Sequence, residues 1–204
     1  MGDAGERRYP LRTVRLGEVR LPDGRLAAAD PLTFGSEVPP FTVEVEPGVY
    51  PIDLAVADAG SSGIRVALAR ISFSSAPVIE WRIAHTAAQD PSTLRGDEIF
   101  GYGVDSGTGA FADPVVFAAL DAALTEDDDL CDRWIEQGEA RAEELGMPHG
   151  FALMVTIGPG DAAMFSSGWG DGSYMSWIGY DATGRAAQVV TDFAVIEAVD
   201  IPNS

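Results

Sequence analysis

The first third of the chain alternates apolar and polar residues with a period of two, which is the pattern of half-buried β-strands. Apolar side chains stand two positions apart at 14 and 16, at 19 and 21, and again at 41, 43 and 45. Proline and glycine, which favour turns, interrupt the pattern at 22–24, 39–40 and 47–48. Strand patterns broken by turns about every ten residues predict an antiparallel sheet, sandwich or barrel.

Two hairpins are expected in this region, one joining 14–21 to 25–29 and the other joining 64–73 to 78–83. Residues 49–56 also favour a strand. Pro51 within it lacks a backbone N–H, which predicts a sheet edge or the start of a strand.

The middle of the chain changes to helical spacing. Asp113-Pro114 predicts a helix start, because aspartate caps helices and proline suits the first helical position. The pattern from Thr125 to Asp128 predicts a second cap, and Gly146 predicts the end of the second helix. Apolar residues expected to line the buried faces are Val116, Phe117, Leu120, Leu124, Leu130, Trp134, Ile135 and Leu145.

The last third returns to strand patterns, at 150–157, 162–166, 173–180 and 186–196. The predicted fold class is therefore α+β, mostly antiparallel β as a sandwich or open barrel, with a two-helix insertion. We expect a flexible tail over 1–11 and one β-rich domain over 12–204, with the helical insertion at about 114–145.

Charge narrows the range of partners. The net charge is −19, and all 13 basic residues are arginine. This balance argues against nucleic acid and against an anionic membrane, and leaves a basic protein partner, a cation or simple solubility. The single cysteine, Cys131, excludes an internal disulfide. With no secretory signal or spanning segment in the sequence, a cytoplasmic protein is expected.

Two segments, 101–113 and 165–174, combine glycine, acidic, hydroxyl and aromatic residues. We call them the glycine-rich segments and expect them to lie side by side at one end of the sheet. Glycine permits close approach of a ligand, and the polar oxygens supply hydrogen bonds. The candidate binding residues are Tyr102, Asp105, Ser106, Thr108, Ser166, Ser167, Trp169, Asp171, Tyr174 and Asp192.

A divalent cation is left open as a cofactor, with Asp105, Asp113, Asp171 and Asp192 as candidate ligands. The competing interpretation is structural: 105–109 as a hairpin turn closed by the Asp105 side chain, and Asp113 as a helix cap. No nucleotide-cofactor motif is present, because the dinucleotide fingerprint is incomplete and the P-loop needs a lysine.

Several strings resemble the bacterial domain-of-unknown-function family 4241. They are GYGVDSGTGAFAD at 101–113, FSSGWGDGSY at 165–174, FTVEVEPGVYP at 41–51 and VTDF at 190–193. The resemblance covers about 14–196 and supports treating the glycine-rich strings as one unit. It implies no reaction, cofactor or substrate.

Three functions therefore stay open. The first is an acidic binding or inhibitor-type protein that docks on a basic partner. The acids expected to form its docking surface are Glu126, Asp127, Asp128, Asp129, Asp132 and Glu136. The alternative is that they form only a solvated helix face, in which Arg133 and Arg141 relieve the repulsion. The second is a metal-dependent hydrolase that uses the clustered aspartates. The third is a small-ligand binding module with Tyr102, Trp169 and Tyr174 as the wall of a cleft. The sequence decides neither among these functions nor the oligomeric state.

Overall fold

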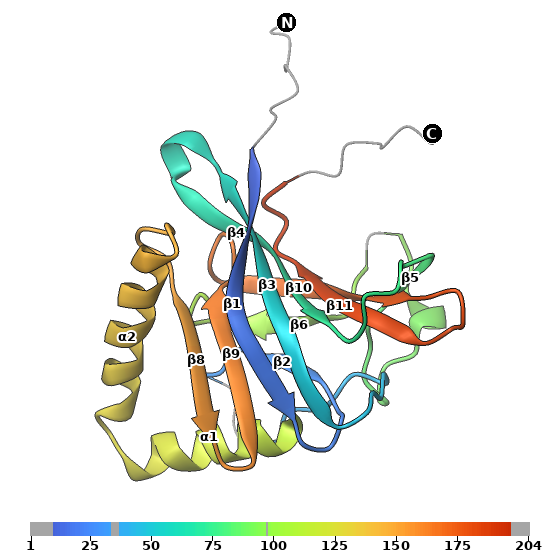
Figure 1. Ribbon diagram of the computed structural model, residues 1–204, viewed down its shortest axis with the longest axis horizontal. Coiled ribbons are helices and arrows are strands. Elements are labelled where there is room, and N and C mark those ends of the chain that lie inside the picture. The colour runs from blue at the N-terminus through green and yellow to red at the C-terminus, as the bar shows by residue number, and fades with distance from the viewer. Residues whose placement is uncertain (1–9, 34–36, 97, 197–204) are drawn as a thin grey trace, which may run out of the picture.

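Two antiparallel sheets and a helix pair form three layers, with the smaller sheet between the larger sheet and the helices (Figure 1). The structure is a computed structural model that describes residues 10–33, 37–96 and 98–196. The sheets do not close into a barrel, so the α+β sandwich with a two-helix insertion is confirmed. No helix in these ranges is long and apolar enough to cross a membrane.

The larger sheet has seven strands. In spatial order they are β1 (Leu11–Leu21), β3 (Gly48–Asp58), β4 (Ile64–Ser72), β11 (Ala186–Asp192), β10 (Gly172–Tyr180) and β5 (Glu80–Ile83), with β6 (Gly101–Val104) also paired to β10. One edge of β10 is shared, since its first residues pair with β6 and its last residues pair with β5. This sharing places the chain around 84–100 beside the first glycine-rich segment.

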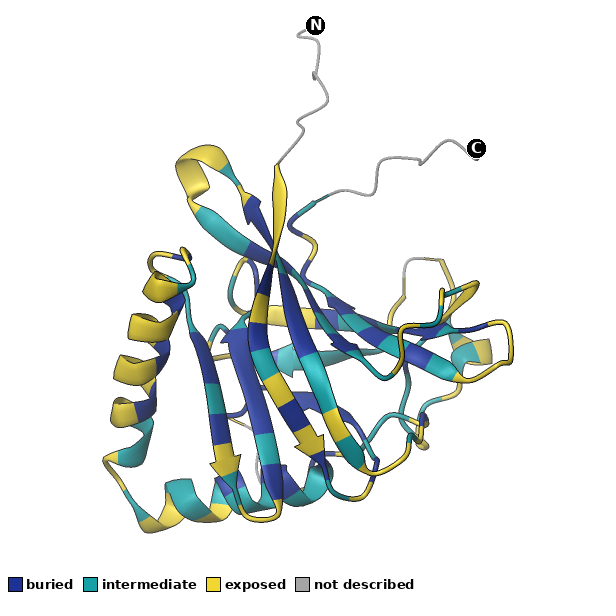
Figure 2. Ribbon diagram, viewed as in Figure 1, coloured by how far each residue is buried: buried dark blue, intermediate teal, exposed yellow. Residues whose placement is uncertain are grey.

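The smaller sheet has the order β2 (Ala27–Ala29), β7 (Thr108–Ala112), β9 (Gly160–Ser166) and β8 (Ala152–Ile157). Both of its faces are covered. Phe111 and Phe165 belong to the core shared with the larger sheet, whereas Ala110 and Met164 belong to the core beneath the helices. Figure 2 shows these strands as largely buried. Burial on both faces explains why they lack polar alternation.

The helices are α1 (Pro114–Glu126) and α2 (Leu130–Glu144), besides 3₁₀ turns at Gly60–Ser62 and Pro91–Thr93. The predicted cap at Asp113 is confirmed, because its carboxylate accepts a hydrogen bond from the Val115 N–H. The predicted cap at Thr125 is wrong: α1 continues to Glu126, and Asp129 precedes α2 without a side-chain cap bond.

The buried face of α2 differs in part from the expected one. Trp134, Gly138 and Ala142 are buried, but Ile135 is exposed. Small residues let the helix lie close to the sheet, and the ring of Phe151 occupies the space beside Gly138.

Both predicted hairpins are wrong. The 25–29 segment does not return along β1; Ala27–Ala29 forms β2 in the other sheet and pairs with β7. β4 pairs with β3 and β11, and β5 pairs with β10. A period of two shows that a strand is half-buried, but it does not identify the strand's partner.

Pro51 lies in an interior strand, which corrects the expectation of a sheet edge. It stands opposite Glu18 of β1, while the pairing of β3 with β4 begins only at Ile52. The missing N–H therefore falls outside the stretch of β3 that pairs with β4.

The segment 41–46 and the start of the chain also differ from expectation. Residues 41–46 make only isolated bridges and no continuous strand, although Val43 is buried and its neighbours are exposed. Of the predicted tail, 1–9 lies outside the described residues, and Leu11 already belongs to β1.

Candidate functional site

The two glycine-rich segments lie side by side, as the sequence predicts. In the larger sheet the start of the first segment, Gly101–Val104, pairs with Gly172–Met175 at the end of the second segment. In the smaller sheet Thr108 stands opposite Ser166. Between the sheets the Ser167 N–H donates to the Gly107 carbonyl at 3.0 Å. Both segments thus cross from one sheet to the other at the same place.

A cavity of about 250 Å³ opens beside this crossing. Its described lining is mainly apolar and includes no charged side chain. The lining residues are Ala28, Ala29, Val38, Pro39, Phe41, Ala84, Thr86, Gln89, Phe100, Gly101, Tyr102, Gly103, Tyr174 and Ser176. Both glycine-rich segments therefore contribute to the wall of one cavity, which we call the inter-sheet cavity.

Tyr102 and Tyr174 are the two predicted site residues that line the cavity, and they stand opposite each other on β6 and β10. The Tyr102 hydroxyl is buried and has no hydrogen-bond partner among the described residues. Burial strongly raises the pKa of its phenol. The nearby Thr191 side chain acts in the opposite direction, but the two hydroxyls do not reach hydrogen-bond geometry.

The glycine at 109 is explained by Tyr102. A Cβ on Gly109 would lie 2.8 Å from the Tyr102 hydroxyl oxygen and 3.2 Å from the Phe165 ring. Tyr174 is fixed differently: its hydroxyl donates to the Gly170 carbonyl at 2.7 Å, and its ring meets Phe193 edge-on. The glycines in these segments thus make room for the two tyrosines.

Asp30 is the residue that sequence reasoning missed. It is fully buried, and it accepts hydrogen bonds from the N–H groups of Leu32, Asp105 and Ser106 and from the Ser106 hydroxyl, at 2.7–2.9 Å. Burial alone would raise the pKa of Asp30, but these hydrogen bonds outweigh burial and hold the pKa below its usual value. The only signal in the sequence is an aspartate before a proline, which marks the end of a strand pattern and no site.

The turn at 105–107 is therefore closed by a distant carboxylate. The alternative in which Asp105 closes its own turn is wrong, because the N–H groups there donate to Asp30. Asp105 itself is exposed. Ser106 serves the turn, and Thr108 is buried in β7.

Other predicted residues hold the second glycine-rich segment together. The Ser166 hydroxyl accepts from the Phe151 N–H at 2.7 Å, and the buried Ser167 hydroxyl donates to the Gly170 carbonyl at 2.8 Å. Trp169 is exposed, not in the cavity wall; its indole N–H donates to the Ala194 carbonyl, and the Arg65 guanidinium lies over its ring.

The four candidate metal ligands do not come together. Asp113 is fully buried, and both of its carboxylate oxygens accept backbone N–H groups, from Asp23, Arg25 and Val115. Asp192 accepts from the Ala194 N–H, and Asp171 is exposed. Among the residues that the structure describes, no three His, Cys, Asp or Glu side chains are grouped to hold a metal ion. The geometry gives the metal-dependent hydrolase no support.

The sequence also did not reveal a pair of hydroxyl groups at the cavity wall, those of Ser176 and Thr191. Ser176 lines the cavity, and the Ser176 hydroxyl shares a buried 2.7 Å hydrogen bond with Thr191. The alternation on β10 places Ser176 on the same face as Tyr174. The sequence pattern therefore predicted the face on which Ser176 lies, but not that this face lines a cavity.

This arrangement can be compared with known proteins. A family model described as "Protein of unknown function (DUF4241)" matches residues 19–191. The chain belongs to this family. The DUF4241 match spans both sheets, both helices and both glycine-rich segments. No curated protein and no solved structure matches the chain significantly.

Proposed function

We propose that this DUF4241 protein is a small-ligand binding module whose site is the inter-sheet cavity. The observation that carries the proposal is that both glycine-rich segments contribute to the wall of this one cavity. Ligand sites are concave and mostly apolar, with a few polar groups that orient the ligand. Ser176 and Gln89 supply such polar groups to the lining, whereas the Tyr102 hydroxyl is buried beside Gly109.

The lining defines the chemical class of the ligand. An apolar cavity of about 150 Å³ admits benzene, and the inter-sheet cavity is larger, at about 250 Å³. A charged ligand would lose its hydration without gaining an opposite charge from the described lining. The fitting ligand is a neutral molecule about the size of one ring, with a hydroxyl or amide group.

The test is a methyl NMR titration with phenol, benzamide and cyclohexanol. We expect saturable shifts of the Ala29, Val38 and Ala84 methyl signals, because these residues line the cavity. Thr86→Trp, which places a large ring in the cavity wall, should abolish the shifts. Thr125→Trp on the exposed end of α1 is the matched control and should leave them unchanged. No saturable shift, or equal shifts in Thr86→Trp, would refute the site.

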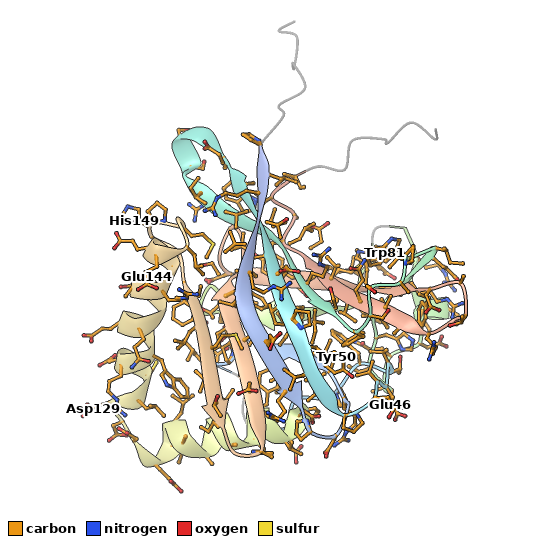
Figure 3. All side chains as sticks on the ribbon, in the orientation of Figure 1. Glu46, Tyr50, Trp81, Asp129, Glu144 and His149 are labelled. Carbon is orange, nitrogen blue, oxygen red and sulfur yellow. The ribbon has the colours of Figure 1, made fainter. Side chains whose placement is uncertain are left out.

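The outer face of α2 favours a second candidate function, docking on a basic partner. Arg133 is paired with Asp127, and Arg141 is paired with Glu144. The remaining acids of this face are exposed and have no ion pair among the described residues: Glu126, Asp128, Asp129, Asp132, Glu136, Glu139 and Glu143. Figure 3 shows Asp129 and Glu144 on the side of α2 away from the sheets.

Affinity capture from native lysate tests whether this acidic face binds a basic protein. We compare the wild type with Asp127→Asn/Asp128→Asn/Asp129→Asn and with a control of equal charge change, Glu18→Gln/Glu37→Gln/Glu98→Gln. Docking predicts a basic partner that is lost only in the aspartate variant and is released by salt, since salt screens surface charge. Equal binding by all three proteins would exclude α2 as the docking surface.

A further inference from the structure

A second and larger concavity lies on the other side of the segment 38–46. Val38, Pro39 and Phe41 line the inter-sheet cavity, whereas Thr42–Glu46 lines a groove of about 800 Å³. The far wall of the groove comes from the start of β3, the residues that follow β4 and the β10–β11 turn. Its volume is within the range of about 300–1,000 Å³ that is typical of small-molecule pockets.

Aromatic rings form one wall of the groove. Tyr50 and Phe73 meet edge-on, with ring centroids 5.2 Å apart, and the Tyr50 hydroxyl donates to the backbone carbonyl of Glu46. Tyr180 also lines the groove, and its ring already holds one cation, with the Arg82 guanidinium 4.7 Å from the centroid. The faces of aromatic rings are negative and attract cations.

Carboxylates line the groove beside these rings. Glu44 and Glu46 are exposed and have no ion pair among the described residues. Burial raises the pKa of Tyr50, and the Glu46 charge raises it further, so the negative field of these carboxylates reaches the ring. Figure 3 shows Glu46 and Tyr50 close together at the start of β3.

The remaining charged groups of the groove do not cancel this field. Arg185 is the one cation of the described lining, and Asp181 is a further acid. Asp181 is bound in its own turn, where one carboxylate oxygen accepts from the N–H groups of Thr183 and Arg185. The lining therefore has an excess of negative charge beside three half-buried aromatic rings.

We propose that this groove binds a small organic cation, an ammonium group carried on a short apolar body. The ammonium lies between Glu44, Glu46 and the Tyr50 ring, and the apolar body packs on Phe73 and Tyr180. The excess negative charge of the lining disfavours anions. The inter-sheet cavity differs, because its described lining has no charged side chain. The groove is thus a separate site and does not depend on the proposed function.

The experiment compares choline with 3,3-dimethylbutan-1-ol, a neutral molecule of the same shape, by NMR titration of Tyr50, Phe73 and Tyr180. Choline should bind at least about tenfold more tightly, since only the cation gains the ring and carboxylate attraction. Glu44→Gln/Glu46→Gln should weaken choline binding about tenfold. Glu18→Gln/Glu98→Gln removes the same charge elsewhere and should leave binding within about twofold of the wild type.

Each of the following results would overturn the proposal. The first is that the neutral molecule binds as tightly as choline. The second is that the two glutamine variants weaken choline binding equally. The third is that a short lysine peptide shifts the signals of Tyr50, Phe73 and Tyr180 while choline does not. The last result would make the groove a docking site for a basic protein segment. Shifts confined to Ala29, Val38 and Ala84 would place the ligand in the inter-sheet cavity and also contradict the groove.

Discussion

At the scale of single residues, two buried carboxylates organise the site from a distance. Asp30 closes the turn of the first glycine-rich segment, and Asp113 joins α1 to the turn at Asp23–Arg25. Both accept backbone N–H groups that would otherwise be buried without partners, and such groups are costly to leave unpaired. Both aspartates therefore serve the structure, and Asp30 holds the turn that follows the cavity-lining strand β6.

The cap at Asp113 gives the first prediction. Asp113→Ala should lower the free energy of unfolding by about 2 kcal/mol or more, the upper end for a helix cap, because Asp23 and Arg25 also lose their acceptor. Urea denaturation measures the change. Asp121→Ala, on the partly exposed side of the same helix, is the control and should cost less than about 0.5 kcal/mol. Equal costs for the two variants would contradict the capping role.

A second prediction concerns Tyr102 and Gly109. Gly109→Ala places a methyl group 2.8 Å from the Tyr102 hydroxyl, so it should destabilise the protein. Tyr102→Phe removes both this contact and a buried hydroxyl without a partner, and should change stability by less than about 1 kcal/mol.

The double variant decides whether the two residues act on each other. With Tyr102→Phe present, Gly109→Ala should cost at least about 0.5 kcal/mol less than it does alone. Additive costs would show that the close approach is not responsible.

At the scale of elements, the sequence predicted the strands and helices better than their partners. The cap and the helical spacing after Asp113 predicted α1 closely, because those signals are local. Neither hairpin was correct, because β2 pairs with a strand about eighty residues away and alanine carries no pattern that identifies such a partner. The adjacency of the glycine-rich segments was predicted from shared composition, whereas Asp30 was missed because its bonds are to distant backbone.

The packing of α2 gives a prediction that opposes helix propensity. Alanine in place of glycine inside a helix is normally stabilising by about 1 kcal/mol. At Gly138, however, an added Cβ would lie 2.2 Å from the Phe151 ring, so Gly138→Ala should be destabilising by at least about 1 kcal/mol. Thermal denaturation measures the sign. In a Phe151→Leu background the same change should be less harmful; a stabilising Gly138→Ala would contradict the close contact.

At the scale of the whole molecule, the charge of −19 and the buried aspartates act in opposite directions as pH falls. Protonation of exposed acids relieves repulsion. The pKa of Asp30 and that of Asp53 are lowered: burial alone would raise both, but hydrogen bonds outweigh it, from backbone to Asp30 and from Arg70 and Arg15 to Asp53. A lowered pKa stabilises the fold above the unfolded value of about 3.9, and this stability is lost as pH falls through the folded value.

We therefore predict that the free energy of unfolding is flat or rises from pH 7 to about 5 and falls steeply below about pH 4. Urea denaturation at constant ionic strength measures the profile. Asp30→Asn should cost about 2 kcal/mol at pH 7 and make the acid fall shallower. The exposed Asp171→Asn should keep the wild-type profile. An unchanged acid limb in Asp30→Asn would contradict the role given to this carboxylate.

The central claim is that the inter-sheet cavity binds a small neutral ligand. A crystal structure after soaking with phenol and benzamide tests this claim most directly. Our account predicts density for one ring against Tyr102, Tyr174 and Ala84, with the polar group toward Ser176 or Gln89. The Thr86→Trp variant should lose this density under the same soak. An unoccupied cavity at saturating probe, or probe found only at other surfaces, would contradict the claim that the glycine-rich segments build a ligand site.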